Sequence, residues 1–246
     1  MSSPQRSRTR AVALVIVLMA AAGAAGWFAQ RQLGGGAGDR AAVEAIVRAY
    51  ILEHPEILPE AMENLQRRQN KGQLAAVRTV VEQPYPGAVL GNPRGTVTLV
   101  EFTDYACGYC RKSAADVEKL IGAHPELRVV LRELPIISPH SAAAARMALA
   151  AAEQGKYPQF HAAMFAAGQL DPAAIEGAAR TAGLDLERAR KVAASDAVAR
   201  ELRRNLELAQ TLGFGGTPSW VVGEEIIPGA VGADRLAEAI AAAKPG

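Results

Sequence analysis

The feature that most restricts the fold is a pair of cysteines, Cys107 and Cys110, which are the only two in the 246 residues. They follow an apolar run from Thr96 to Thr103, which is typical of a buried strand, and a helical pattern then continues to about Gly122. Alternating apolar residues from Leu127 to Leu134 predict a second strand. Strand, helix and strand in this order form a βαβ unit with parallel strands. The cysteines are therefore expected where a strand leads into a helix.

Three interpretations of the cysteine pair are open: a zinc site, an inert disulfide and a redox-active pair. A zinc site needs about four ligands, and the remaining candidates are scattered without metal-ligand spacing: His54, His124, His140 and His161. A disulfide across so short a loop would constrain the unfolded chain little. The redox interpretation is favoured because a helix N-terminus offers unpaired N–H groups and partial positive charge to a Cys107 thiolate. Cys110, one turn into the helix, would resolve the mixed disulfide.

The body of the protein is predicted to extend over residues 83–246 as an α/β fold with a helical insertion. Alanine-rich helices are expected from about Ser141 to Leu212, with breaks near Gly155, Gly168–Pro172 and Gly183. A hairpin is expected from Ser219–Val222 and Glu225–Ile227, followed by a helix over Asp234–Ala243. Because a parallel crossover needs only about a dozen residues, the surplus at about 140–213 predicts an inserted helical subdomain.

Residues 1–30 have the order of a signal peptide or membrane anchor. Three arginines precede a run without charge over residues 11–29, which is long enough to span a bilayer core of about 30 Å. Both alternatives place the body in the periplasm or on the extracytoplasmic face, where disulfides persist. The 27 basic and 25 acidic residues leave the rest of the chain close to neutral. That balance argues against a nucleic-acid partner.

A helical arm is expected over residues 39–82, after a Gly-rich linker at 31–38. Its apolar residues recur at helical spacing, and Pro55 and Pro59 predict at least two helices. The arm is too thin to form its own core, so its apolar face must pack on the body or on a second copy. A possible homo-oligomer through this arm is one expectation.

Two segments resemble a known family. Residues 90–110, which end in Cys-Gly-Tyr-Cys, resemble the active-site entry of the DsbA-type thioredoxin-fold proteins, and Gly213–Trp220 resembles their cis-proline segment. The resemblance covers about residues 84–244 and implies a thioredoxin-like fold with a helical insertion. The arm is similar to the extension of the suppressor-of-copper-sensitivity thioredoxin-like proteins. In that group the extension can mediate oligomerisation, which favours disulfide isomerisation.

The resemblance implies a role for each matching residue. Cys107 corresponds to the nucleophile, Cys110 to the resolving thiol and Pro218 to the cis-proline. Thr217 would pair its backbone with an extended substrate, and Glu101 would move protons to and from the second cysteine.

The residues between the cysteines, Gly108 and Tyr109, depart from the Pro-His pair of the strongest oxidants in the family. A tyrosine cannot provide the positive charge that a histidine can. The disulfide should therefore be less oxidising than the most oxidising disulfides of this kind, whose reduction potential is about −120 mV. Tyr109 also offers a flat, half-apolar surface for unfolded segments.

The sequence therefore predicts an extracytoplasmic thiol–disulfide oxidoreductase or isomerase. Its expected substrates are unfolded or misoxidised secreted proteins, and a membrane redox partner would reset the disulfide. No cofactor and no metal are implied. The alternatives are a non-catalytic peptide- or partner-binding module and a module in which the thiolate pair handles copper(I).

Overall fold

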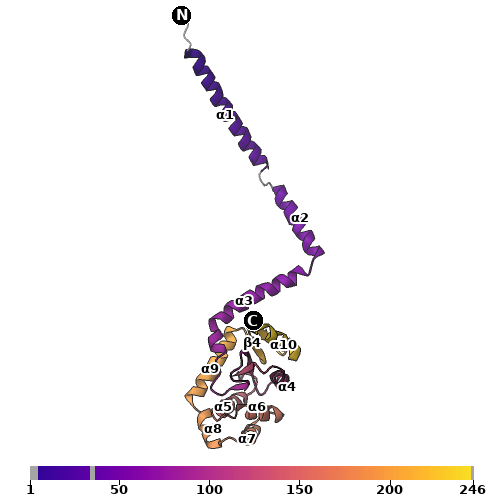
Figure 1. The fold of residues 1–246 in the computed structure, drawn as a ribbon, viewed down its shortest axis with the longest axis vertical. Helices are drawn as coiled ribbons and strands as arrows, with labels where there is room; N and C mark the ends of the chain where they lie inside the picture. The colour runs from indigo at the N-terminus through magenta and orange to yellow at the C-terminus, as the bar shows by residue number, and fades with distance from the viewer. Residues whose placement is uncertain (1–4, 34–36, 245–246) are drawn as a thin grey trace. The chain divides into compact units, whose positions relative to one another are not determined.

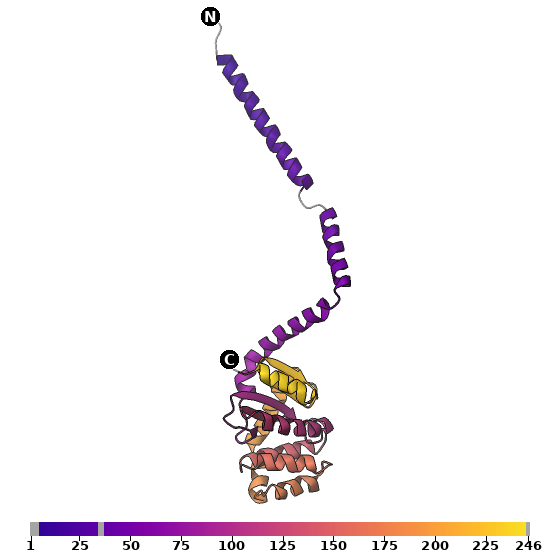
Figure 2. The same cartoon turned by 45° about the vertical axis from the view of Figure 1, so that its right-hand side comes forward.

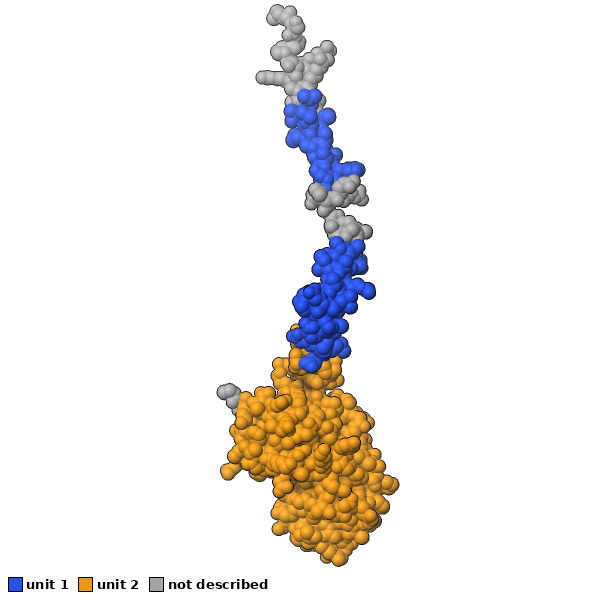
Figure 3. Space-filling model, turned by 90° about the vertical axis from the view of Figure 1, so that its right-hand side faces the viewer, with its two compact units in different colours: residues 1–63 blue, residues 64–246 orange. Residues whose placement is uncertain are grey.

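The computed structural model describes residues 5–33 and 37–244, with side chains for residues 14–29 and 40–244. The chain divides into two compact units, residues 1–63 and 64–246, which Figure 3 colours separately. Helix α1 (Gln5–Leu33) includes the apolar run. Among the described residues no helix is long and apolar enough to cross a membrane.

The first unit contains α1, α2 (Ala37–Glu53) and the beginning of α3 (Ile57–Val81). Residues 34–36 of the predicted linker lie outside the described residues, and its remaining residues belong to α1 and α2. The arm has two helices, as predicted. The chain breaks at Pro55, whereas Pro59 lies in the first turn of α3, where a missing N–H does no harm.

A five-stranded sheet forms the centre of the second unit (Figure 1), in the order β1-β3-β2-β4-β5. As predicted, β2 (Val97–Thr103) and β3 (Leu127–Glu133) are parallel and joined through α4 (Gly108–Ala123). The predicted hairpin is β4 (Ser219–Val222) with β5 (Glu225–Pro228), and β4 pairs antiparallel with β2. The short β1 (Val89–Gly91) was not predicted, because its three residues lie among turn-forming residues.

The long connection between β3 and β4 is helical, as predicted. It contains α5 (Ser141–Ala152), α6 (Tyr157–Ala166), α7 (Pro172–Thr181), α8 (Leu186–Ala193) and α9 (Asp196–Thr211). The break before α9 was not predicted; there the Ser195 side chain accepts a hydrogen bond from the Val198 N–H and caps the helix. Helix α10 (Gly232–Ala242) ends the body, and Figure 2 shows it in yellow.

The sheet is covered on both faces, because successive side chains of a strand point to opposite sides. On β2, Val97 and Leu99 belong to a core cluster with residues of α4, α5, α6 and α10. Val100 and Phe102 belong to the opposite cluster, with residues of α3 and α9. Glu101 alternates with the second set, so it lies on the α4 face.

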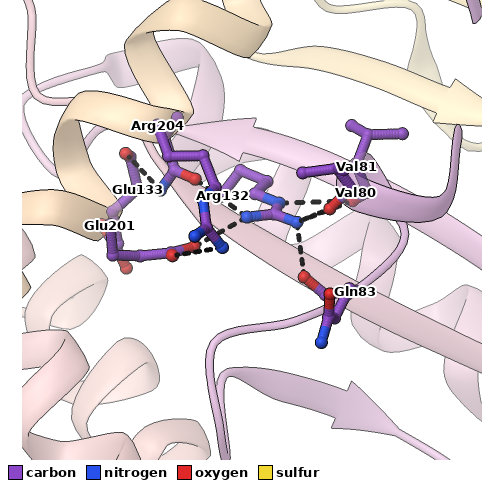
Figure 4. A network of polar contacts seen from close by, with 8 residues as sticks. Val80, Val81, Gln83, Arg132, Glu133, Glu201 and Arg204 are labelled. Carbon is purple, nitrogen blue, oxygen red and sulfur yellow. Dashed lines mark hydrogen bonds and ion pairs between the residues drawn. The ribbon is translucent and has the colours of Figure 1, made fainter. Parts of the chain in front are cut away.

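A buried arginine joins three elements on the opposite face (Figure 4). Arg132 of β3 is 1% exposed and donates hydrogen bonds to the backbone carbonyls of Val80, Val81 and Gln83 at the end of α3. The last carbonyls of a helix lack hydrogen-bond partners within the helix. The guanidinium of Arg132 supplies the donors for these carbonyls. It also donates to the side chains of α9, Glu201 at 2.7 Å and Asn205 at 3.0 Å.

The second unit therefore begins earlier than the predicted boundary at residue 83. It begins at Asn64, within α3. Leu74 and Val81 of this helix are fully buried, with Val77 packed beside them. The later half of the predicted arm is part of the body, because its apolar face is buried against the sheet and its end is fixed by Arg132.

We expect Arg132→Met to lower the free energy of unfolding by about 3–5 kcal/mol, because the buried Glu201 carboxylate and the carbonyls of α3 lose their partner. Arg204→Met is the matched control. Arg204 also contacts Glu201, at 3.6 Å, but its side chain is 54% exposed, so the loss should be below about 1 kcal/mol. Urea unfolding of the two variants measures both values, and equal losses would contradict this role of Arg132.

Candidate active site

Cys107 occupies the N-cap position of α4. Its sulfur accepts a hydrogen bond from the backbone N–H of Cys110, with 3.2 Å between Sγ and N. The residue is only 5% exposed. The first N–H groups of the helix thus point toward this sulfur, in a position where they stabilise negative charge. This is the placement predicted from the sequence for the attacking sulfur.

Cys110 is fully buried within the first turn of α4. Burial raises the pKa of its thiol, and the nearby Glu101 carboxylate raises it further. The Cys110 thiol therefore keeps its proton at neutral pH. A group that acts as a nucleophile from this position needs a base to remove that proton.

The segment before β4 faces the cysteines. The peptide bond between Thr217 and Pro218 is cis, as the resemblance implied. The Cys107 thiol lies 3.2 Å from the backbone carbonyl oxygen of Thr217 and donates to it. The structure therefore brings Cys107, Cys110, Thr217 and Pro218 together from segments that are about a hundred positions apart in the sequence.

Asp104 organises the turn that leads into α4, and the sequence analysis did not single it out. One carboxylate oxygen accepts from the Ala106 N–H at 2.8 Å and from the Ser141 hydroxyl at 2.7 Å. The other accepts from the backbone N–H groups of Ile136 and Ile137 at 2.8 and 2.9 Å. An acid directly after a buried strand, three residues before the first cysteine, is a signal that could have indicated this role.

Glu101 is 1% exposed on β2, where its register partner on β4 is Trp220. Neither of its carboxylate oxygens has a hydrogen-bond partner. Burial raises its pKa well above the usual value, and the charge of Glu133 raises it further, ahead of a smaller effect of Cys107. Glu101 therefore favours its protonated form more than an exposed glutamate does, and it lies on the same sheet face as α4.

Apolar side chains are exposed at the start of α4 and in the segment after β3. Tyr109 is 69% exposed, and Gly108 is exposed with open space around its Cα. Ile136 and Ile137, in the segment that Asp104 holds, are 47% and 51% exposed. Exposed side chains of this size are available to contact an extended polypeptide.

A cysteine pair at the start of a helix, after a central strand and opposite a cis-proline, defines the active site of a thioredoxin-fold protein. The model of the DSBA-like thioredoxin domain matches residues 98–241, and the chain belongs to this family of thiol–disulfide oxidoreductases. The model of the copper resistance protein ScsC N-terminal domain matches residues 39–71. Both resemblances expected from the sequence are confirmed.

Solved structures agree with this assignment. A thioredoxin-like oxidoreductase from Silicibacter pomeroyi is 42% identical, with a TM-score of 0.64 over 67% of this chain and 95% of that one. ScsC from Proteus mirabilis in a transitional conformation is 29% identical, with a TM-score of 0.63 over 85% of this chain and 97% of that one. A periplasmic thioredoxin-like protein from Salmonella enterica is 27% identical, with a TM-score of 0.61 over 68% and 95%.

Curated relatives are much longer. The Na(+)/H(+) antiporter NhaA 1 of Salinispora arenicola is 31% identical over 161 residues, which are 64% of this chain and 25% of the antiporter. The chain thus spans about a quarter of the length of this relative.

We expect Asp104→Asn to lower the free energy of unfolding by about 1–3 kcal/mol and to slow the reaction of Cys107 with a small disulfide. An amide nitrogen cannot accept, so at least one N–H group that Asp104 binds loses its acceptor. Asp116→Asn is the matched control. Asp116 lies on α4 and forms an i,i+3 ion pair with Lys119 at 3.6 Å. Its replacement should change the free energy of unfolding by less than about 0.5 kcal/mol. Chemical denaturation and reaction rates measure both effects, and an Asp104→Asn protein as stable as wild type would refute the assignment.

Proposed function

We propose that the protein catalyses thiol–disulfide exchange on extracytoplasmic protein substrates through Cys107 and Cys110. The observation that supports this most directly is the hydrogen bond from the Cys110 N–H to the Cys107 sulfur at the N-cap of α4. Backbone amides in this position stabilise a leaving or attacking sulfur as it carries negative charge. The Thr217 carbonyl and the exposed Tyr109 border the same sulfur.

The reaction proceeds through a mixed disulfide. A substrate thiolate attacks the Sγ of Cys107 in the oxidised pair, the bond between Cys107 and Cys110 breaks, and the Cys110 sulfur leaves with the electron pair. A second substrate thiolate then attacks the mixed disulfide, which forms the substrate disulfide and releases Cys107 as a thiolate. In the opposite direction Cys110 attacks the mixed disulfide, after its proton has moved to a base.

Glu101 is suited to act as that base, and to act as the acid when the reaction runs in the other direction. It is buried close to the cysteines with both oxygens unpartnered, and its raised pKa favours the protonated form. The departing Cys110 thiolate is a strong base, because burial raises the pKa of that thiol. Glu101 donates a proton when the disulfide opens and takes it back when the disulfide closes.

The substrate class follows from the surface and the compartment. Tyr109, between the cysteines, and Ile136 and Ile137, in the segment that Asp104 binds, expose apolar area, which favours unfolded or misoxidised polypeptides over small polar thiols. The similar Salmonella enterica protein is periplasmic, and the apolar N-terminal run supports the same compartment for this chain. A membrane redox partner would reset the disulfide, and its redox state would decide between oxidation and isomerisation.

The arm provides a surface for a second copy of the chain. Val43, Ile46, Val47 and Tyr50 of α2 are each more than half exposed and recur on one helical face. Residues 39–71 match the ScsC N-terminal domain. We therefore infer a homo-oligomer that buries this stripe, which brings several active sites to one substrate and favours isomerisation.

Replacement of Cys110 by serine should trap substrates. Without the resolving thiol, mixed disulfides through Cys107 persist, and non-reducing gels of an extracytoplasmic extract should show adducts that disappear on reduction. Cys107→Ser is the matched control, since it retains Cys110 and the apolar surface. A binding module without exchange activity would capture the same proteins without covalent adducts, and that outcome would contradict the proposed function.

Substitution on α2 tests the oligomer without disturbing the body. Ile46→Asp places a charge in the apolar stripe and should convert the oligomer to monomer in light scattering, with a loss of scrambled-disulfide repair. Arg48→Asp changes an exposed residue beyond that stripe and should leave the oligomer intact. Deletion of residues 39–82 is less informative, because it also removes the buried Leu74 and Val81. A wild-type monomer would disprove the oligomer.

A further inference from the structure

A second buried carboxyl group lies on the same sheet face as Glu101. Glu133 ends β3 and is fully buried. In the parallel ladder Glu101 is the register partner of Leu131, and Glu133 is that of Thr103. The two glutamates are thus diagonal neighbours, two positions apart along adjacent strands, with side chains on one face.

Glu133 is held by a buried cluster that the sequence analysis did not identify as functional. The hydroxyl groups of Tyr157 and Tyr105 donate to one carboxylate oxygen of Glu133, at 2.6 and 3.1 Å. The Tyr105 hydroxyl also lies 3.2 Å from Nδ1 of His161. The Tyr105 hydroxyl proton is directed to Glu133, so the Tyr105 oxygen must accept from the Nδ1–H of His161. Every donor of the cluster is therefore directed toward Glu133.

The remaining oxygens of the two carboxyl groups have no partner. These are both oxygens of Glu101 and one oxygen of Glu133. Among the described residues, no arginine or lysine forms an ion pair with either group; Arg132, next to Glu133 in sequence, points to the opposite face. Two buried carboxylates without a cation cannot both be ionised, so the pair holds at least one proton.

We propose that Glu133 is a positioning residue of the exchange reaction, which sets how firmly Glu101 holds the proton that it passes to Cys110. This inference rests on the proposed function. When Glu101 gives its proton to the Cys110 thiolate, Glu101 becomes a carboxylate close to Glu133. A negative charge on Glu133 opposes that change, so it favours the return of the proton to Glu101.

The cluster borders a cavity at His161. This residue lines a cavity of about 440 Å³ together with residues of α4, among them Arg111 and Glu118. Burial lowers the pKa of His161 to about 4, so the ring is neutral at pH 7 and adds no positive charge to the cluster. The charged or titratable groups that face Glu133 are Glu101, Asp104, Tyr105, Tyr157 and, through Tyr105, His161.

The effect of Glu133 on Glu101 follows from the surroundings of each carboxyl group. Burial raises the pKa of Glu133 to about 8, although the hydrogen bonds from Tyr157 and Tyr105 lower it. Glu101 receives no such bonds, and burial together with the charge of Glu133 raises its pKa well above the usual value. Removal of the Glu133 charge should therefore lower the pH at which Glu101 ionises.

Carboxyl-carbon NMR of the full chain, labelled at its glutamate side chains and fully reduced, tests this influence of Glu133 on Glu101. Glu101 is assigned by the signal missing from Glu101→Gln. In Glu133→Gln we expect the Glu101 midpoint to fall by about one pH unit or more, and the pH profile of exchange with a small disulfide to move in the same direction. Glu118→Gln, which removes an exposed charge at the cavity, is the matched control and should move neither.

Tyr157→Phe provides a second variant if Glu133→Gln does not fold. It removes one hydrogen bond that keeps Glu133 ionised, so Glu133 is neutral more often and the Glu101 midpoint should fall by a smaller amount. The proposal is overturned if the midpoint of the Glu101 titration is unchanged in whichever of the two variants fold. The test is separate from that of the proposed function, because absence of trapped adducts in Cys110→Ser would refute exchange without altering the carboxyl titration.

Discussion

The carboxylate of Asp104 is the contact on which the geometry of the active site depends. It follows directly after β2 and binds the turn before α4, the segment after β3 and the start of α5 through four hydrogen bonds. A charged acceptor that is 1% exposed needs these donors. In turn, it fixes the helix N-terminus that stabilises the Cys107 sulfur, and it fixes the segment that contains Ile136 and Ile137.

Each face of the sheet contains a buried polar group with a different task. On one face Arg132 neutralises Glu201 and completes the end of α3, so its charge is matched and its role is structural. On the other face Glu101 has no partner, and Glu133 has donors on one oxygen only. A satisfied buried charge stabilises the fold, whereas an unsatisfied carboxyl group with a raised pKa is available to exchange protons.

Much of the fold could be predicted because its signals are local. An apolar run predicted β2, the alternation of apolar residues predicted β3, and the glycine breaks predicted the helices between β3 and β4. β1 was missed because a three-residue strand has no period of its own. The boundary after the arm was placed too late, since the turn-rich residues 84–87 mark a bend in the chain, whereas the compact unit begins at Asn64, within α3, and the first buried residue of α3 is Leu74.

The sequence by itself determined the cysteine pair, its place at a helix N-terminus and the family, because spacing and strand-to-helix order are properties of neighbouring residues. Only the tertiary structure decided which groups surround the pair. Thr217 meets Cys107 because β4 pairs with β2, and Glu133 shares a face with Glu101 because the parallel register places it there. The partners of a buried polar group come from distant segments, and register and packing select them.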